Sequence, residues 1–340
     1  MGLPINRWYV VASTDEIGAE PLARQVCGKR VVLFRDADGD IVCLDDRCSH
    51  RGFPLSAGRV VDGQIQCNYH GLRFDNCGRC TWAPGQDRIP SRANIVAHTT
   101  AVQGPWVWLW VGDLTAPDPG LLPRFPWLDD PDWAVVHGME PLAARYGLLV
   151  DNLLDLSHET FLHAGFIGTP EVAETPITTE VDEDAGVIRV SRHMEAAECP
   201  PFYSESTGLQ SPIDRWQDIE YHAPGNYLLH IRVAPHGQDP ADDDNGKAAY
   251  VKVLYGITPS TESTTLDFWA VCRNFAIDDD EVSAFMAKMN REVVLQDVEA
   301  LDQLEVYLAE QEAAGVTPVE VSFKIDTGGL AGRRMVEAMS

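Results

Sequence analysis

The sequence predicts an α+β protein of two domains, an all-β domain over residues 1–115 and a mixed domain over residues 116–340. The chain has 340 residues, which is more than one hydrophobic core usually serves. Short β-type runs fill the first part, whereas the second part adds long helical patterns. A proline-rich segment, residues 115–126, lies between them and is typical of a domain boundary.

The strands of the first domain are predicted from runs of β-branched and aromatic residues. Asp-Gly and Cys-Gly turns separate these runs, as expected for a small β domain. The predicted strands are residues 8–12, 30–34, 40–44 and 106–110.

The second domain opens with a helical pattern over residues 146–163, continues as alternating strands and ends in a long helix that begins near Asp278. Gly315 and Pro318 are expected to stop that helix. The predicted strands are residues 187–192, 227–233, 249–255 and 266–271. Apolar residues recur at helical spacing along the long helix: Val282, Phe285, Met286, Met289, Val293, Leu301, Leu304 and Leu308.

The formal charge of −26 argues against nucleic acid and anionic membranes as partners. The N-terminal residues show no leader pattern, and no apolar run reaches transmembrane length, so we expect a cytoplasmic protein. In a reducing compartment the eight cysteines are expected to be metal ligands or free thiols. Cys77 and Cys80 resemble a redox pair, but their Gly/Asn-rich surroundings favour a hairpin turn with two free thiols.

Two short motifs, Cys48-x-His50 and Cys67-x-x-His70, indicate an inorganic cluster. Two thiolates can hold one iron of a [2Fe–2S] cluster while two imidazoles hold the other, which is the Rieske ligand set. A structural zinc site is the alternative. Zinc motifs usually group Cys with Cys and His with His, whereas each loop here carries one of each.

The segment around these motifs is basic within an acidic chain. Residues 47–92 contain seven Arg and three acidic residues, a net charge of +4. A basic segment around a redox centre would attract an acidic electron donor. A chance cluster of solvated arginines remains the alternative.

A second metal site is suggested by His158 and His163, which lie in the segment 151–163 with several carboxylates. Two histidines and one carboxylate form the facial triad of non-haem Fe(II) oxygenases. Five residues correspond to about 140° around a regular helix, so both can face one metal only if the helix is interrupted between them. Asn152, Asp155 and His158 are spaced by threes and are expected to share one helix face.

The carboxylate of this triad is sought in the final helix. Asp297 lies between the apolar Val294 and Leu301, close to the predicted buried stripe, whereas Glu299 and Asp302 are expected on the solvated face.

With these motifs in place, nearly the whole chain resembles the oxygenase components of vanillate O-demethylases, a group of Rieske non-haem iron oxygenases. The general features are the two cluster motifs and the segment 151–163. Those more specific to the demethylases are residues 6–11, 192–195, 199–203, 214–217, 273–275 and 325–330.

The resemblance implies an N-terminal Rieske domain and a C-terminal helix-grip domain, in which a curved antiparallel sheet surrounds a long helix. It implies Asp297 as the third ligand of the mononuclear Fe(II). It also implies a homotrimer in which the cluster of one subunit feeds the iron of its neighbour. Asp155, with Asn152 beside it, would have a catalytic role by bridging a cluster histidine to an iron histidine. A separate ferredoxin-type reductase would supply electrons from NADH.

The expected reaction is oxidative O-demethylation of a small methoxylated aromatic acid with O2, such as vanillate to protocatechuate and formaldehyde. From their positions, Phe166, Ile167, His230 and Tyr255 are expected to line the substrate pocket. Arg232 could pair with a substrate carboxylate or form a structural ion pair. His230 and Tyr255 stand where dicamba demethylases carry Asn and His, which argues against dicamba itself as the substrate.

Three alternatives remain open. The nearest is hydroxylation of the ring or methyl group of another aryl carboxylate or sulfonate. A non-catalytic Rieske electron carrier would need only the first domain, and the histidine pair of the second domain argues against it. A structural zinc module would lack the visible colour of an iron–sulfur cluster.

Overall fold

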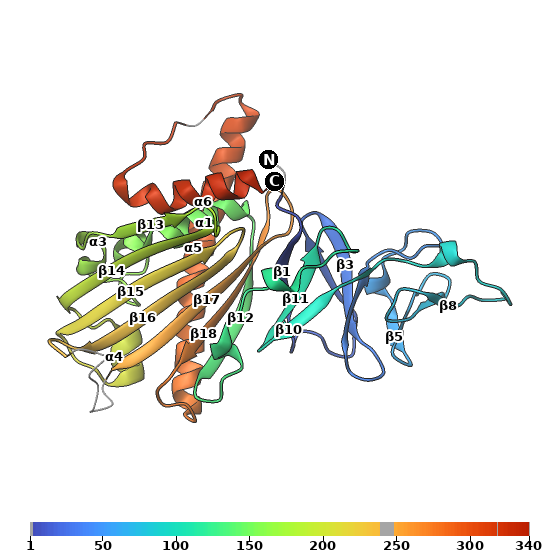
Figure 1. The fold of residues 1–340 in the computed structure, drawn as a ribbon, viewed down its shortest axis with the longest axis horizontal. Helices are drawn as coiled ribbons and strands as arrows, with labels where there is room; N and C mark the ends of the chain where they lie inside the picture. Colours follow the sequence, from blue (N-terminus) through green and yellow to red (C-terminus); the bar gives the residue numbers. More distant parts are fainter. Residues whose placement is uncertain (1–2, 239–247, 318, 340) are drawn as a thin grey trace. The chain divides into compact units, whose positions relative to one another are not determined.

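The computed structural model describes residues 3–238, 248–317 and 319–339, and it divides into two compact units. One unit consists of Ile5–Pro123 together with Thr258–Glu262, and the other is formed mainly by Arg124–Ile257 and Ser263–Ser340. The first is built from strands, whereas the second combines a large sheet with helices, which confirms the α+β prediction (Figure 1).

The first unit contains three small sheets with strand orders β1-β11-β10, β2-β3-β4-β9 and β5-β6-β7-β8. Its apolar residues form two clusters. One lies around β1, β3 and β11, and the other includes residues of β3, β4 and the sheet β5-β6-β7-β8, with Cys48 and Cys67. The strands are β1 (Arg7–Ser13), β2 (Leu22–Val26), β3 (Lys29–Arg35), β4 (Ile41–Asp45), β5 (Arg59–Val61), β6 (Gln64–Gln66), β7 (Arg73–Phe74), β8 (Cys80–Trp82), β9 (Ala97–His98), β10 (Thr100–Gln103) and β11 (Trp106–Val111).

The second unit is organised around a seven-stranded sheet of order β12-β18-β17-β16-β15-β14-β13. Long strands pair antiparallel with their sequence neighbours, and β12 pairs with β18 at one edge. The strands are β12 (Ala134–Leu142), β13 (Thr178–Asp182), β14 (Val187–Ala197), β15 (Ile213–His222), β16 (Asn226–Pro235), β17 (Ala249–Pro259) and β18 (Thr265–Arg273).

Helices pack against this sheet, and Figure 1 shows the long helix α5 running along one of its faces. The short turns of 3₁₀ helix include η5 (Leu156–His158), which matters for the site below. The α-helices are α1 (Tyr146–Leu154), α2 (Glu159–Leu162), α3 (Pro170–Glu174), α4 (Pro201–Thr207), α5 (Asp280–Ala313) and α6 (Thr327–Ala338).

The bounds of α5 follow from its terminal residues. The side chain of Asp279 accepts hydrogen bonds from the N–H groups of Glu281 and Val282, which are otherwise unpaired in the first turn. Gly315 follows the helix with a left-handed φ of 71°. The helix therefore ends near Gly315 as predicted, while Pro318 lies outside the described residues.

Most of the predicted apolar stripe on α5 packs against the sheet, but Leu304 does not and is 42% exposed. The buried position beside it belongs to Glu305, whose carboxylate pairs with Arg145 at 2.7 Å. An ion pair thus replaces the apolar contact that helical spacing predicted at this turn.

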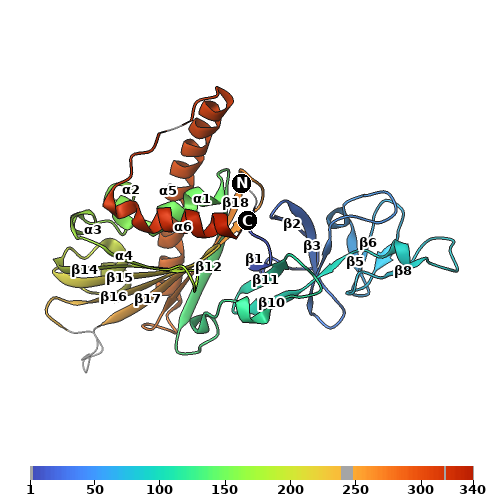
Figure 2. The same cartoon turned by 45° about the horizontal axis from the view of Figure 1, so that its top comes forward.

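The C-terminal helix α6 packs closely on α1, as Figure 2 shows. Small residues permit the approach, because a Cβ on Gly329 would lie 3.0 Å from Asp151 Oδ1 and one on Gly332 would lie 3.2 Å from Leu154 Cδ1. Arg333 adds an ion pair to Asp151 at 2.6 Å. Helix α6 is not predicted from the sequence, because three glycines weaken its helical pattern.

No helix among the described residues has the length and apolar character needed to cross a lipid bilayer.

Candidate cluster and iron sites

The two loops that carry the Cys/His motifs have the same backbone geometry. In each loop the glycine four residues after the cysteine donates its N–H to the cysteine carbonyl at 2.9 Å, from Gly52 to Cys48 and from Gly71 to Cys67. Both glycines have a left-handed φ, 72° and 80°, which glycine adopts at no steric cost. Two matching loops therefore present their ligands as a pair.

The four side chains of these loops form two close pairs in the first unit, one of thiols and one of imidazoles. Cys48 and Cys67 are each 1% exposed, whereas His50 and His70 are exposed and their ring centroids lie 4.5 Å apart. Burial, with a further contribution from the Cys67 thiol, raises the pKa of Cys48 to about 11. A bound metal would reverse this, since coordination deprotonates a thiol. Two buried thiols and two exposed imidazoles would fit the two-Cys, two-His ligand set of a Rieske cluster.

Cys77 and Cys80 lie at the hairpin between β7 and β8, and both are free thiols. Asp75 shapes the turn by accepting hydrogen bonds from the N–H groups of Cys77 and Arg79. The prediction of a hairpin turn with two free thiols is confirmed.

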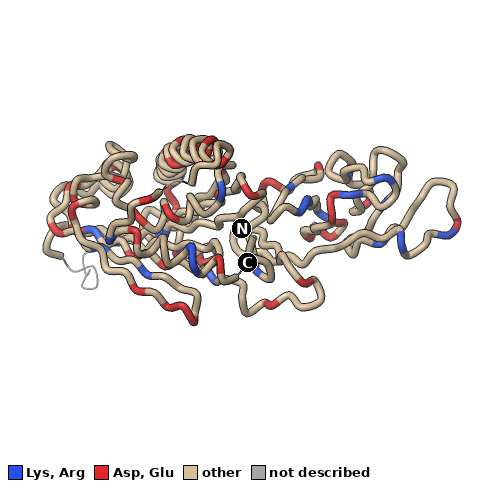
Figure 3. Tube along the Cα trace, turned by 90° about the horizontal axis from the view of Figure 1, so that it is seen from above, with Lys and Arg blue, Asp and Glu red and all other residues tan. Residues whose placement is uncertain are grey.

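The basic segment surrounds the cluster loops. Arg88 and Arg92 line an open groove that also contains His50 and His70. Acidic residues are spread widely over the second unit, as Figure 3 shows, while Lys and Arg recur in the first.

The helix that leads to the histidine pair is interrupted, as predicted from the five-residue spacing of His158 and His163. Helix α1 ends at Leu154, Asp155 is extended, and the chain continues through η5 into the one-turn helix α2. His158 closes η5 and His163 follows α2, so the two imidazoles approach to 5.1 Å between ring centroids. The prediction that Asn152, Asp155 and His158 share one helix face is wrong, because no single helix contains all three.

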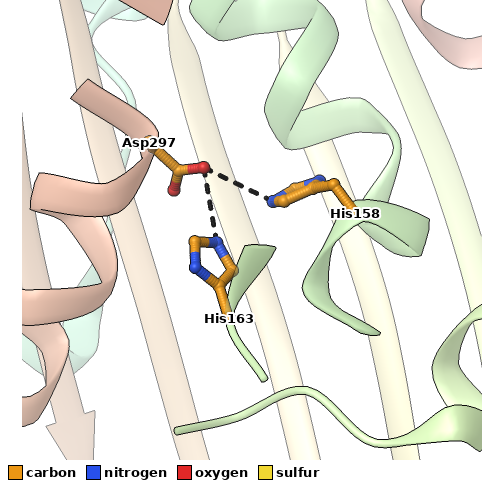
Figure 4. A group of neighbouring side chains, drawn as sticks. All are labelled: His158, His163 and Asp297. Carbon is orange, nitrogen blue, oxygen red and sulfur yellow. Dashed lines mark ion pairs between the residues drawn. The ribbon is translucent and has the colours of Figure 1, made fainter. Parts of the chain in front are cut away.

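Asp297 on α5 completes the group, as drawn in Figure 4. Its Oδ1 lies 3.6 Å from His158 Nε2 and 3.3 Å from His163 Nε2. One ligand atom of each residue falls within 4.8 Å of the others. His163 and Asp297 are buried, and His158 is partly exposed. This arrangement of two imidazoles and a carboxylate is the facial donor set expected for Fe(II).

Neighbouring groups orient all three donors. His158 Nδ1 lies 2.6 Å from the main-chain carbonyl of Asp155, and His163 Nδ1 lies 2.8 Å from the side-chain carbonyl of Gln296. Each imidazole therefore carries its proton on Nδ1, which leaves Nε2 available to bind a metal. Asn152 Nδ2 donates to Asp297 Oδ1 at 3.0 Å.

The contact between Asp155 and an iron-site histidine is present, but through the main chain. The Asp155 carboxylate instead accepts a hydrogen bond from the N–H of Ser157 at 2.9 Å. Of the two alternatives to Asp297, Glu299 is exposed as expected. Asp302 is not simply solvated, since it accepts a hydrogen bond from the N–H of Ala143 at 2.8 Å.

A cavity of about 50 Å³ adjoins the triad. It is smaller than the roughly 300–1,000 Å³ of typical small-molecule sites, and most of its lining is apolar or aromatic. It is lined by Leu153, Leu156, His158, Glu159, His163, Ile167, Phe202, Tyr203, Arg215, Tyr227, Leu229, Ile231, Val253, Tyr255, Asn290, Val293 and Asp297.

Of the predicted pocket residues, Ile167 and Tyr255 line this cavity, whereas Phe166, His230 and Arg232 do not. Successive side chains of a strand point to opposite faces of a sheet. On β16, Leu229 and Ile231 face the cavity, so His230 and Arg232 must face away.

The contacts of His230 and Arg232 agree with this placement. His230 Nδ1 accepts a hydrogen bond from Lys252 Nζ at 2.8 Å, and Arg232 pairs with Asp218 at 2.9 Å. Burial and the Lys252 ammonium lower the pKa of His230 to about 4, so this imidazole stays neutral. Arg232 therefore forms the structural ion pair that was its alternative role, and it does not line the cavity.

The sequence does not predict a site role for Glu159, Arg215, Gln217 or Asn290, although Arg215 and Gln217 lie in the demethylase-like segment 214–217. Glu159 lies between the two histidines, and its contacts are with Arg215 and Gln217 on β15. The signal that could have found it is its position within the His158–His163 segment.

Comparison with known proteins agrees with this geometry. The profile of the Rieske [2Fe–2S] domain matches residues 7–93, and that of the vanillate O-demethylase oxygenase C-terminal domain matches residues 142–340. The chain belongs to the vanillate O-demethylase oxygenase family. It is thus a Rieske non-haem iron oxygenase with a Rieske [2Fe–2S] domain and a mononuclear iron site.

Members of this family resemble the chain over nearly its full length. The vanillate O-demethylase oxygenase subunit of Pseudomonas sp. (strain HR199 / DSM 7063) is 33% identical over 98% of this chain and 94% of its own. The oxygenase component of dicamba O-demethylase from Stenotrophomonas maltophilia is 31% identical over 93% and 92%. A crystal structure of dicamba monooxygenase bound to 3,6-dichlorosalicylic acid superimposes with a TM-score of 0.91 at 29% identity, covering 98% of this chain and 96% of that one.

Proposed function

We propose that this protein is the terminal oxygenase of an O-demethylase that acts on a small methoxylated aromatic acid, most simply vanillate. The observation that carries the proposal is the apolar cavity directly beside the His158–His163–Asp297 triad. The two vanillate O-demethylase relatives, 33% and 34% identical, support the choice of substrate class.

In this proposal His158, His163 and Asp297 hold the mononuclear iron, and Cys48, His50, Cys67 and His70 hold the cluster. The Nδ1 contacts of both imidazoles and the amide of Asn152 keep the three donors directed at one point. The bound iron supplies the activation of O2 needed to insert one oxygen atom into a C–H bond. The chain's own part is to bind the substrate and orient its methoxy carbon toward that point.

Neutral side chains can provide the polar contacts of the substrate. Asn290 and Tyr227 line the cavity, and neither Asn290 Nδ2 nor the Tyr227 hydroxyl has a hydrogen-bond partner within the described ranges. Burial raises the pKa of Tyr227 and Tyr255 well above the ordinary tyrosine value, so both hydroxyls stay protonated and can donate. Such donors suit the carboxylate or phenol of an aromatic acid.

The balanced reaction consumes the aryl methyl ether, O2, NADH and a proton, and yields the phenol, formaldehyde, NAD⁺ and water. Hydroxylation of the methyl carbon gives a hemiacetal, which collapses when its O–H proton is lost and the aryl oxygen leaves. A ring hydroxylase would release no one-carbon product, so formaldehyde distinguishes the two reactions.

The test incubates the purified protein with vanillate, NADH and a surrogate ferredoxin-type reductase. We expect formaldehyde and protocatechuate in equal amounts. Hydroxylation of a methylated or unmethoxylated aryl acid, without formaldehyde and without turnover of vanillate, would refute the demethylase assignment. A toluene-4-sulfonate monooxygenase subunit from Comamonas testosteroni, 31% identical over 82% of this chain, makes that second reaction worth including in the screen.

We further propose that the protein works as a homotrimer in the cytoplasm, with the cluster of one subunit reducing the iron of the next. The exposed His50 and His70 support transfer to another protein surface. Asp155 is proposed to connect His158 to a cluster histidine of the neighbouring subunit, with its main-chain carbonyl on one side and its carboxylate on the other.

The variant Asp155→Asn isolates the carboxylate, since the main-chain contact to His158 does not depend on the side chain. An amide can still accept the hydrogen bond from Ser157, so both metals and the trimer should be retained. We expect turnover to fall at least tenfold, consistent with the effect of residues that orient metal ligands. Metal content, gel filtration and single-turnover reduction of the iron are the measurements, and wild-type turnover by a fully loaded trimer would exclude the relay.

A further inference from the structure

A buried carboxylate outside the His158–His163–Asp297 group lies between the two histidines in the sequence. Glu159 directly follows His158, precedes His163 by four residues, and is only 3% exposed. Strand β15 supplies its partners. Arg215 Nη2 lies 2.9 Å from Glu159 Oε2, and Gln217 Nε2 lies 2.9 Å from Oε1 and 3.1 Å from Oε2. Arg215 and Gln217 are each 1% exposed.

Arg215 also reaches beyond the second histidine. Its Nη1 donates to the main-chain carbonyl of Ile167 at 2.9 Å, and its guanidinium lies over the ring of Tyr203 at 5.1 Å. One side chain thus holds the chain before His163, at Glu159, and after it, at Ile167. The segment 159–167 is fixed to β15 at both ends.

The backbone of this segment allows little adjustment. The N–H of His163 donates to the Glu159 carbonyl at 3.1 Å. Gly168 approaches the same carbonyl so closely that a Cβ there would lie 1.8 Å from its oxygen. Helix α2 has only four residues, too few to be stable without tertiary contacts. The placement of the segment that follows His158 and carries His163 therefore depends on the contacts that hold Glu159.

We propose that Glu159, Arg215 and Gln217 are positioning residues that set the geometry of the His158–His163 pair for iron. This inference rests on the proposed assignment of the iron ligands. The charge of Arg215 is balanced by Glu159, so the guanidinium serves as an anchor of the histidine segment and not as the counter-ion of an acidic substrate. Loss of either Glu159 or Arg215 would leave the other charge buried and unpaired, so the two charges depend on each other.

The experiment uses the full chain with its cluster intact and the mononuclear iron removed by a chelator. Glu159→Gln removes the charge but keeps the size of the side chain. The double variant Glu159→Leu/Arg215→Met removes both charges and keeps the site packed, a replacement that is often neutral or stabilising for a buried ion pair. Asp218→Asn is the matched control, because it makes the same acid-to-amide change in an ion pair of β15 that faces away from the cavity.

Ferrous iron affinity is measured by titration, the iron geometry by the electron paramagnetic resonance of its nitric oxide adduct, and stability by thermal unfolding. We expect Glu159→Gln to weaken iron binding about 10- to 100-fold. The double variant should unfold at the wild-type temperature yet still bind iron weakly and with an altered resonance, and Asp218→Asn should match the wild type.

Wild-type iron affinity and resonance in Glu159→Gln would overturn the inference. Recovery of both in the double variant would also overturn it, since the ion pair would then serve only stability. These outcomes can be distinguished from failure of the proposed function. If the iron-ligand assignment on which that function depends were wrong, the variant His158→Ala would bind iron with the wild-type affinity.

Discussion

The variant His158→Ala is expected to lose the mononuclear iron and all turnover while keeping the colour of the iron–sulfur cluster. His158 supplies one of only two imidazoles in the triad, and its Nε2 lies 3.6 Å from Asp297 Oδ1. Its Nδ1 is held by the Asp155 carbonyl, which directs Nε2 toward the other two donors, and alanine removes that donor. A site left with one imidazole and one carboxylate should bind Fe(II) too weakly to survive purification.

Iron content and visible absorbance measure this result together. The iron per chain should fall by one, to the two atoms of the cluster. His230→Ala is the matched control, because this imidazole bonds to Lys252 and does not line the cavity. Full turnover by His158→Ala, or equal loss of iron in His230→Ala, would show that the iron is held elsewhere.

The positions of the candidate ligands could be read from the sequence because they depend on local spacing, and the structure brings these side chains together. The cluster motifs place Cys and His two and three residues apart, within single turns whose geometry glycine fixes. Asp297 was favoured by its neighbours Val294 and Leu301, which are 1% and 6% exposed. A residue beside a buried stripe of a helix faces the same way as that stripe, which is a local property.

The substrate cavity could not be predicted in the same way, because several strands contribute to it. Residues 230 and 232 were chosen by position, but neighbouring residues of a strand point to opposite faces. A prediction that is wrong by one residue therefore selects side chains on the face of the sheet opposite the cavity. Leu229 and Ile231 occupy the positions that His230 and Arg232 were expected to fill.

Buried charges were the other source of error. Arg and Glu side chains usually lie at the protein surface, so the sequence alone favours solvent-exposed positions for Arg215 and Glu159. Their burial follows from a contact between α2 and β15, 56 residues apart, which no local pattern encodes. The sequence shows that Glu159 lies between two histidines and that Arg215 and Gln217 lie in the demethylase-like segment 214–217, but not that these side chains meet.

The variant His70→Ala is expected to bleach the cluster and abolish turnover while the mononuclear iron stays in place. His70 is one of two exposed imidazoles whose rings lie 4.5 Å apart, and an iron of a Rieske cluster needs both of them. The apolar clusters of the first unit and that of the second contain different residues, so the sheet and helices around the triad should remain folded.

The measurements are visible absorbance, iron content and thermal unfolding, with His98→Ala as the matched control. His98 lies in the same unit, but its Nε2 pairs with Asp45 at 2.8 Å and it is not among the residues of the cluster loops. We expect His98→Ala to keep the colour and His70→Ala to retain one iron per chain. Because that remaining iron would have no electron supply, reductase and NADH should produce no formaldehyde. Turnover by a colourless His70→Ala protein would mean that electrons reach the iron by another route, and the cluster would then have no role in the reaction.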